Sequence, residues 1–172
     1  TQSSSKSSSS AFFKIEDPNI EYKIVQQELW LKSKTQILGY LNSSMDRFTE
    51  DGWFKTGDLV EVDSSGYLKI VGRLNEIINV GGEKVFPIEV ENLLHKIPEI
   101  KDCVVFGETN PITGQMVVAR VSVRGDYKVS EVKKIITNYC KNKIEGFKIP
   151  AKIILMSEIE YTERFKKKRV WD

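Results

Sequence analysis

The 172-residue chain contains few of the residues that usually build metal centres and nucleophilic active sites. It has two cysteines, and His95 is its only histidine. Cys103 lies in a short apolar run and Cys140 on one face of an expected helix, each without a cysteine or histidine partner near it in the sequence. A zinc site needs several such ligands, and Ser–His or Cys–His catalysis needs a paired imidazole, so the sequence argues against both. We expect two buried, reduced thiols in a cytoplasmic protein.

Long apolar runs and a strong net charge are also missing. No run approaches the roughly 20 apolar residues that cross a bilayer, so we expect no transmembrane segment. The N-terminus lacks the apolar centre of a secretory signal. The formal net charge of +2 is too small to indicate a nucleic-acid or anionic-membrane partner, and no motif of basic and aromatic residues for base stacking is evident. The composition, 40% hydrophobic and 29% charged, is typical of a soluble globular protein.

The first part of the chain is rich in strand patterns. Residues 1–10 read TQSSSKSSSS and form a flexible segment, either a solvated loop or a non-native addition, that is left out of the fold. Residues 11–72 are expected to be the end of a β-rich N-terminal domain whose beginning is missing. The strand-like runs are Tyr22–Val25, Glu28–Lys32, Leu59–Val62 and Tyr67–Val71. The last two flank Asp63-Ser64-Ser65-Gly66, which has the residues of a hairpin turn.

Residues 73–172 are expected to form a second, smaller domain, with a hinge at 73–75 in the polar connector Gly72-Arg73-Leu74-Asn75. Two short strands follow, joined by a tight turn at Gly81-Gly82. Beyond them, strands and helices alternate in an order typical of a small α+β domain with two helices on one face of a sheet. The expected strands are Ile77–Val80, Lys84–Phe86, Asp102–Phe106, Met116–Val123 and Lys152–Met156.

Two helices have clear sequence signals. The first begins at Pro87, whose fixed φ suits the first helical position, and is expected to end at Pro98. The second has Ser130 as its expected N-cap. Apolar residues recur in it at helical spacing and predict one buried face: Val132, Ile135, Ile136, Tyr139 and Cys140.

Several motifs occur in a fixed order between residues 27 and 169. Residues 51–59 read DGWFKTGDL, and residues 66–91 read GYLKIVGRLNEIINVGGEKVFPIEVE. Upstream of them lie QELW at 27–30 and GYL at 39–41. In order and spacing these motifs closely resemble the adenylate-forming superfamily, which contains acyl-CoA synthetases, the adenylation domains of peptide synthetases and beetle luciferases. Gln27 stands where that family usually has glycine.

The resemblance implies the end of a large N-terminal domain, then a β-hairpin hinge and a small, mobile C-terminal domain with two or three helices. It also implies an ATP-dependent ligase of the acyl-CoA synthetase type. A carboxylic acid attacks the α-phosphate of ATP to give an acyl-adenylate and pyrophosphate, and the thiol of CoA or of a carrier protein's pantetheine then takes the acyl group. Mg2+ and the acid would be bound by the N-terminal domain, so the isolated chain is expected to be inactive.

The resemblance assigns two residues to the nucleotide and one to the hinge. Asp58 matches the aspartate that holds the ribose hydroxyls of ATP or AMP, a role that suits a carboxylate accepting two hydrogen bonds. Arg73 matches an arginine that contacts the nucleotide. Without the resemblance, Asp58 would be interpreted as a turn cap and Arg73 as a solvated charge. Asn75 occupies the hinge position, where Asp or Lys is commoner; asparagine tolerates unusual backbone angles.

The resemblance also places Gly81 and Gly82 beside the tunnel through which the thiol arrives. Glycine would let the pantetheine arm pass close to the backbone. A plain hairpin turn is the simpler interpretation of the same two residues.

The last motif reads TERFKKKR at residues 162–169. It is similar to the family's Thr-x-x-Gly-Lys-x-x-Arg pattern and puts Lys166 at the catalytic position, where its charge would stabilise phosphoryl oxygens in the transition state. Phe165 replaces the usual glycine, and Lys167 offers an alternative register. A solvated basic tail is the competing interpretation.

Three functions follow from these observations. A carboxylate–CoA ligase is favoured. An adenylation domain that loads a carrier protein is the second, and a non-catalytic binding module on the same fold is the third, with Phe165 as its main support.

Overall fold

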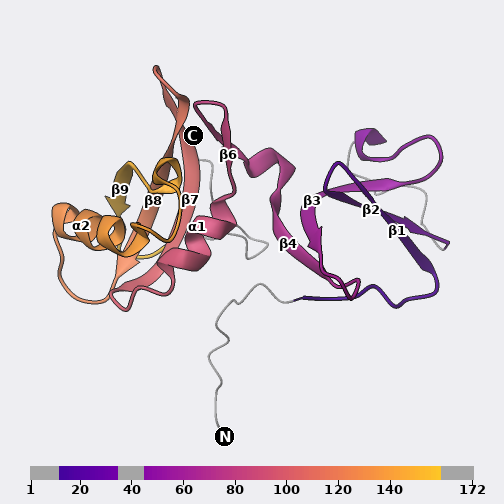
Figure 1. Cartoon of the computed structure of the whole chain (residues 1–172), viewed down its shortest axis with the longest axis horizontal. Coiled ribbons are helices and arrows are strands. Elements are labelled where there is room, and N and C mark those ends of the chain that lie inside the picture. Colours follow the sequence, from indigo (N-terminus) through magenta and orange to yellow (C-terminus); the bar gives the residue numbers. More distant parts are fainter. Residues whose placement is uncertain (1–11, 35–44, 160–172) are drawn as a thin grey trace, which may run out of the picture. The chain divides into compact units, whose positions relative to one another are not determined.

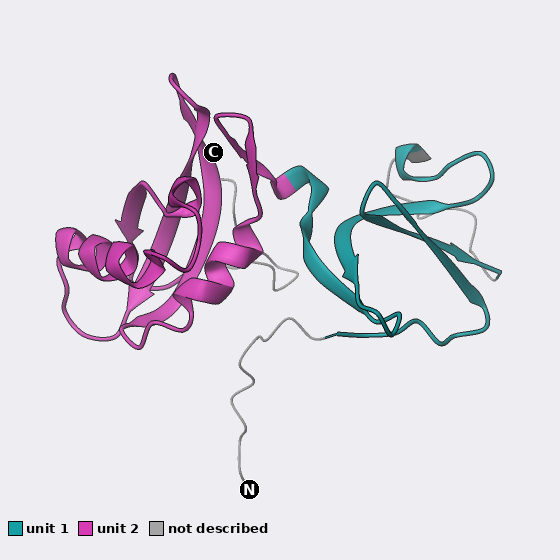
Figure 2. Ribbon diagram, in the orientation of Figure 1, with its two compact units in different colours: residues 1–75 teal, residues 76–172 magenta. Residues whose placement is uncertain are grey.

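The computed structural model describes residues 12–34 and 45–159, and the chain divides into two compact units, residues 1–75 and 76–172 (Figures 1 and 2). The division falls between Asn75 and Glu76, next to the connector in which the sequence places a hinge. Each unit has its own sheet and its own apolar core.

Unit 1 (residues 1–75) is built on one antiparallel sheet whose strands follow in sequence order: β1 (Ile20–Val25), β2 (Glu28–Ser33), β3 (Phe54–Val62) and β4 (Leu68–Arg73). Two short 3₁₀ turns accompany it, Met45–Arg47 and Leu74–Glu76. All four strands expected in this region are confirmed, and β3 extends further toward its N-terminus than the apolar pattern predicts.

The two hairpin turns of unit 1 follow from their residues. Gln26 and Gln27 join β1 to β2 with φ of 51° and 69°. Two successive left-handed residues are typical of a tight hairpin turn, and glycine takes that conformation with least strain, which suits the family's preference at position 27. In the β3–β4 turn, the Asp63 carboxylate accepts the N–H groups of Ser65 (2.8 Å) and Tyr67 (2.9 Å).

The core of unit 1 is small. Leu29, Val60 and Leu68 are buried, and the segment before β1 contributes Phe13 and Ile15 to cover them. Phe13 exchanges two backbone hydrogen bonds with Leu68, which fixes this segment on the sheet.

Unit 2 (residues 76–172) contains a five-stranded sheet and two α-helices in the part described. Its strands are β5 (Ile78–Val80), β6 (Glu83–Val85), β7 (Ile100–Asn110), β8 (Gly114–Val123) and β9 (Lys152–Leu155). Their order is β6-β5-β8-β7, with β9 paired in parallel to β8. The helices are α1 (Pro87–Leu94) and α2 (Val129–Cys140), and a 3₁₀ turn, Gly146–Lys148, precedes β9.

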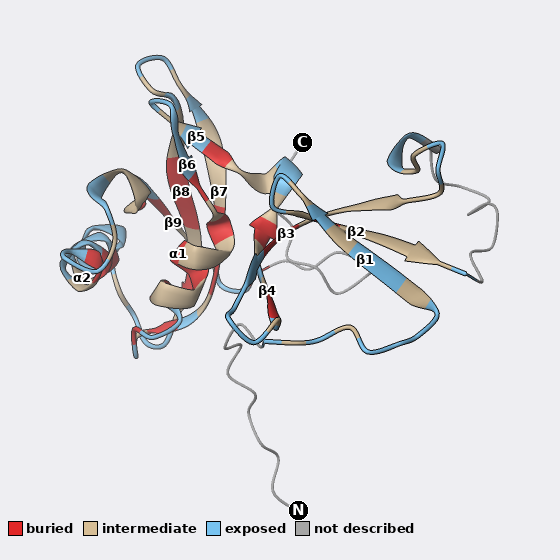
Figure 3. Ribbon diagram, turned by 45° about the vertical axis from the view of Figure 1, so that its right-hand side comes forward, coloured by how far each residue is buried: buried red, intermediate tan, exposed pale blue. Residues whose placement is uncertain are grey.

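Both helices cover the same face of this sheet, as the sequence predicts (Figure 3). Alternate residues of β7, such as Cys103 and Val105, and of β8, such as Ala119, point to that face and are fully buried. They pack with buried helical residues, among them Leu94 of α1 and Ile136 of α2. The α+β fold class is therefore confirmed.

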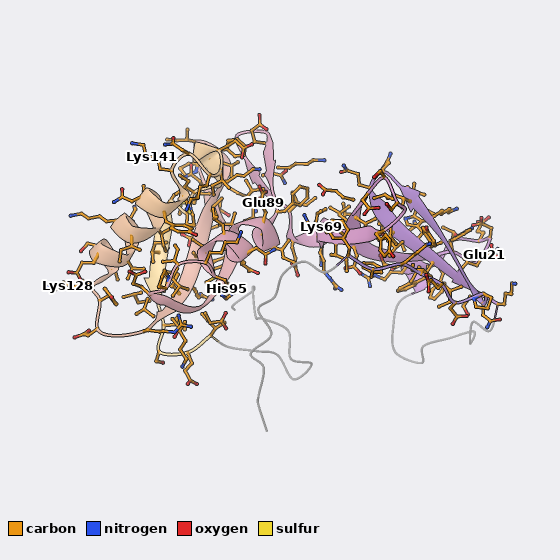
Figure 4. The ribbon with its side chains drawn as sticks, turned by 60° about the horizontal axis from the view of Figure 1, so that its bottom comes forward. Glu21, Lys69, Glu89, His95, Lys128 and Lys141 are labelled. Atoms are coloured by element: carbon orange, nitrogen blue, oxygen red, sulfur yellow. The ribbon has the colours of Figure 1, made fainter. Side chains whose placement is uncertain are left out.

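Two helix boundaries differ from the prediction. Helix α1 ends at Leu94, three residues before Ile97, because the following N–H groups of Lys96 and Ile97 bond in tighter, three-residue turns. Helix α2 begins at Val129, so Ser130 is not its N-cap; Lys128 is, and the Glu131 carboxylate accepts the Lys128 N–H at 2.8 Å. Lys128 and Lys141 lie at the two ends of α2 (Figure 4).

Lys148 links the start of α1 to the chain after α2. Its ammonium donates to the carboxylates of Glu89 (2.9 Å) and Glu145 (3.0 Å), and Glu89 is labelled in Figure 4. Partial burial favours the neutral amine, but the two charged hydrogen bonds outweigh it and raise the pKa of Lys148. This contact ties the first turn of α1 to the 3₁₀ turn before β9.

Among the residues that the model describes, no helix is both long enough and apolar enough to cross a membrane. 

Replacing Ile136 with alanine should destabilise unit 2 by about 2–5 kcal/mol, because the side chain is fully buried and its removal leaves a cavity. Urea unfolding of the 172-residue chain, followed by the helical circular dichroism signal, measures the loss. Ile112→Ala is the matched control, since Ile112 is 90% exposed, and it should change stability by no more than about 0.5 kcal/mol. Equal effects of the two variants would contradict the core assignment.

Candidate functional site

The strand that carries Asp58 is interrupted by a bulge. Opposite Leu29 of β2, residues 56–58 of β3 fall out of register, and regular pairing resumes on either side. Bulges bend a strand and redirect its side chains, and they are frequent next to functional sites. The bulge therefore sets the direction in which Asp58 leaves β3.

Side chains satisfy the backbone groups that the bulge leaves out of the ladder. The Thr56 hydroxyl donates to the carbonyl of Leu29 (2.6 Å) and accepts the N–H of Asp58 (3.0 Å). The N–H of Gly57 donates to the Glu28 carboxylate (2.9 Å). Gly57 has a φ of +75°, so the bulge also needs a residue without a Cβ at this position.

Asp58 and Arg73, the two predicted nucleotide residues, are direct partners across β3 and β4. Arg73 and Asp58 form an ion pair, with 2.9 Å between Arg73 Nε and Asp58 Oδ1. The Asp58 side chain is 20% exposed and that of Arg73 38%, so a ligand can reach both. The guanidinium is a planar fork whose Nη atoms carry further N–H donors.

Asn75 follows Arg73 closely, in the exposed 3₁₀ turn Leu74–Glu76. The boundary between the two units comes directly after it. Its role as a hinge remains a prediction.

Gly81 and Gly82 form the turn between β5 and β6, both with positive φ, 61° and 92°. The Gly81 N–H donates to the carbonyl of Thr113 at 2.8 Å, so the tip of the β7–β8 hairpin supports this turn. Nothing lies within 4 Å of where a Cβ of Gly82 would be. The turn is fixed on one side and open on the other; its place beside a thiol tunnel remains a prediction.

Two other parts of the predicted site lie outside the described residues. These are the C-terminal motif with Phe165, Lys166 and Lys167, and the GYL motif at residues 39–41. Within the described ranges, no group of three or more His, Cys, Asp or Glu side chains is arranged to hold a metal ion.

The sequence reading missed a stack of basic and aromatic side chains on unit 1. The Lys23 ammonium lies 4.9 Å from the centre of the Trp30 ring and 4.3 Å from that of Trp53. The Lys55 ammonium also lies near Trp30, 5.3 Å from the centre of its ring. Cross-strand register brings Lys23, Trp30 and Lys55 into one row, which sequence alone does not show. These contacts lie within the chain and are not a base-stacking motif of the kind that a nucleic-acid partner needs.

Acidic groups accompany this stack. The Trp30 indole N–H donates to the Glu28 carboxylate at 3.0 Å. A hydrogen bond from Thr49 lowers the pKa of Asp51, and the charges of Lys23 and Lys32 lower it further. The stack is thus partly neutralised and gives no independent sign of a polyanionic ligand.

Glu28 and Thr56 are the functional-site residues to which sequence reasoning gave no role. Both lie inside motifs that the resemblance depends on, QELW and DGWFKTGDL. For Glu28, the available signal was a charged residue at the start of an apolar strand pattern. Its partner could not be predicted from this, because the N–H of Gly57 is 29 residues away in the sequence.

Comparison with known proteins adds an independent line of evidence. Residues 89–166 match the family model of the AMP-binding enzyme C-terminal domain. The 2-succinylbenzoate–CoA ligase of Enterococcus faecalis is 37% identical over 127 residues, covering 73% of this chain and 25% of that protein. The acyl-CoA synthetase FUM10 of Gibberella moniliformis is 31% identical over 148 residues, covering 84% and 26%.

A solved structure has the same fold. The o-succinylbenzoate CoA synthetase MenE of Bacillus subtilis, in complex with the acyl-adenylate intermediate OSB-AMP, superposes with a TM-score of 0.75 and 27% identity, covering 87% of this chain and 33% of that one. The chain spans about a quarter of the length of the curated relatives that it matches. By its motifs, its fold and these relatives, the chain belongs to the adenylate-forming enzymes and includes their C-terminal, AMP-binding domain.

Proposed function

We propose that this chain supplies the ribose-binding aspartate, the hinge and the closing lysine of an AMP-forming carboxylate–CoA ligase. The pairing of Asp58 with Arg73, held by the β3 bulge, is the observation that carries the proposal. It puts a carboxylate and a guanidinium side by side and within reach of a ligand. The relatives named acyl-CoA synthetase and 2-succinylbenzoate–CoA ligase support this reaction class.

The chemistry of the pair suits a nucleoside. A carboxylate accepts hydrogen bonds from two neighbouring hydroxyls, and its negative charge strengthens both. Arg73 orients the carboxylate through Nε and presents its remaining donors to ribose or phosphate oxygens. ATP and AMP share this ribose, so the pair would hold the nucleotide before and after the acid displaces pyrophosphate.

Residues 73–75 would be the hinge between an N-terminal domain, to which residues 11–72 belong, and a mobile domain of residues 73–172. Lys166 would act from the mobile domain in the first half-reaction, because its ammonium can neutralise charge that develops on the α-phosphate. In the second half-reaction, the transfer of the acyl group, Gly81 and Gly82 would face the thiol. Mg2+ and the carboxylic acid would be held outside this chain, so the chain alone would not form an adenylate.

CoA is the proposed thiol, because CoA ligases are among the relatives that are 37% identical to the chain. A carrier protein's pantetheine would present the same thiol, and it is the alternative acceptor. Comparing acyl transfer to free CoA with transfer to a pantetheine-bearing carrier protein separates the two.

Lys166→Ala should abolish acid-dependent ATP–pyrophosphate exchange, with a loss of about a hundredfold or more, because a lysine that neutralises transition-state charge is removed. The measurement uses the protein translated from the complete reading frame that contains this chain. Thioester formation from synthetic acyl-adenylate and CoA should be retained. Lys167→Ala is the matched control and should keep the exchange; loss in that variant instead would move the assignment to Lys167.

Asp58→Asn should weaken the use of ATP, because it removes the charge from the carboxylate and replaces an acceptor oxygen with a donor. Loss of charge-assisted bonds worth about 1.5–3 kcal/mol corresponds to roughly a ten- to hundredfold rise in the KM for ATP. The preference for ATP over 2′-deoxy-ATP should shrink in parallel. Glu61→Gln, the same change on an exposed carboxylate of the same strand, is the control and should leave both values unchanged. An unaltered nucleotide preference in Asp58→Asn would refute the ribose assignment.

A further inference from the structure

The bulge in β3 raises a physical question about how Asp58 is held. Gly57, directly before it, lacks a Cβ and has a φ of +75°. Glycine moves between left- and right-handed conformations at little cost, so its own backbone does not hold one conformation. Asp58 follows Gly57 and forms the last pair of the β3–β4 ladder with Arg73, so freedom at Gly57 would loosen the ladder at that end. Something other than local backbone preference must keep this turn in place.

We infer that Glu28 is the residue that positions Asp58 for the ribose of the nucleotide. Its Oε1 accepts the N–H of Gly57 at 2.9 Å, and its Oε2 accepts the indole N–H of Trp30 at 3.0 Å. Both carboxylate oxygens are therefore engaged by donors from different strands. The Gly57 bond holds the turn, and the Trp30 bond is a second contact of the same carboxylate. This inference rests on the proposed role of Asp58 in nucleotide binding.

The Glu28 carboxylate can accept the Gly57 N–H where no backbone carbonyl of β2 can. The bulge puts the Gly57 N–H out of reach of the β2 ladder, and a partly buried N–H without an acceptor costs about 1–3 kcal/mol. Glu28 supplies a charged acceptor, which forms a stronger bond than a neutral carbonyl. Losing it would leave Gly57 free to turn its N–H toward water.

Thr56 completes the arrangement from the other side of Gly57. Its hydroxyl bonds at once to the Leu29 carbonyl and to the Asp58 N–H. The residues before and after Gly57 are thus tied to β2 through Thr56, and Gly57 itself is tied through Glu28. Glu28 is a positioning residue in this account, since it acts on the ligand only through Asp58.

The test compares how strongly enzyme variants prefer ATP over 2′-deoxy-ATP, measured as the ratio of kcat/KM values in pyrophosphate exchange by the complete protein. Glu28→Ala should reduce this preference about tenfold, mainly through the KM for ATP, because a mobile Asp58 no longer meets the ribose hydroxyls. A role in stability alone would lower the amount of active enzyme and affect both nucleotides equally. It would leave the ratio unchanged, and that result would overturn the inference.

Two further variants separate the bonds of Glu28. Trp30→Phe removes the indole donor and leaves the Gly57 bond, so most of the preference for ATP should remain. If it loses as much as Glu28→Ala, the effect comes through Trp30 and the inference is wrong. In the Trp30→Phe background, Glu28→Gln keeps an amide oxygen for the Gly57 N–H without a competing donor, and it should restore the preference that Glu28→Ala loses.

A double variant tells a failure of this inference from a failure of the proposed function. Adding Glu28→Ala to Asp58→Ala should cause no further loss of the nucleotide preference, because both changes remove the same contact. If Asp58→Ala alone leaves the preference intact, the ribose assignment itself fails. If Asp58→Ala abolishes it and Glu28→Ala does not change it, only the positioning role of Glu28 fails.

A second measurement needs no catalysis and uses the 172-residue chain. The Arg73 Nε–H should give a distinct nuclear magnetic resonance signal, because Nε lies 2.9 Å from the charged Asp58 Oδ1. Glu28→Ala should move this signal toward that of a free arginine, and Asp58→Ala, which removes the partner itself, should do so as well. If Glu28→Ala does not fold, Thr56→Val takes its place. It loses the two hydroxyl bonds that hold the same turn, and it should move the Arg73 signal in the same direction. An Arg73 signal that is unchanged in the folded variant would overturn the inference.

Discussion

Hydrogen bonding at one break in the β2–β3 register determines how unit 1 presents Asp58. Opposite Leu29 the strands cannot pair, so the backbone groups of residues 56–58 need other partners. The carboxylate of Glu28 and the hydroxyl of Thr56 provide them. With these groups satisfied, β3 meets β4 in register at Asp58, and the carboxylate faces Arg73. The ion pair is a consequence of how the bulge is satisfied.

Energetics favour a functional explanation for that pair over a structural one. A partly exposed ion pair adds about 0–1 kcal/mol to stability, whereas each large side chain in the core adds several times more. Unit 2 has an extensive buried cluster between its sheet and its two helices, whereas the cluster in the described part of unit 1 is built on Leu29, Val60 and Leu68. The Asp58–Arg73 pair therefore adds little to the stability of unit 1, and both side chains are partly exposed to solvent.

Local sequence signals predicted those features that depend on neighbouring residues. A few adjacent residues are enough to predict the apolar stripe of α2, the turn at Asp63 and the turn at the paired glycines 81–82. The bulge was not, because it depends on which β2 residue each β3 residue meets. The Lys23–Trp30–Lys55 row was missed for the same reason. The N-cap of α2 was misplaced by two residues, because the Glu131 carboxylate accepts the Lys128 N–H and the helix begins at Val129. Registers and long-range hydrogen bonds are properties of the pairing, which the linear pattern does not contain.

Gly57 and the Gly81–Gly82 turn use the same residue type for different purposes, one to hold a neighbouring side chain in place and the other to leave space. At Gly57 the freedom of glycine is needed to enter a left-handed bulge and is then removed by the bonds of Glu28 and Thr56. A site that recognises two hydroxyls needs a carboxylate in a fixed place, so the freedom must be suppressed. At Gly82 the space beyond the Cα is open, and only the neighbouring Gly81 is held, by Thr113. A turn that lets a pantetheine arm pass needs clearance and not a fixed side chain. The hydrogen bonds around each glycine, more than the glycines themselves, therefore distinguish the proposed nucleotide side of the enzyme from its proposed thiol side.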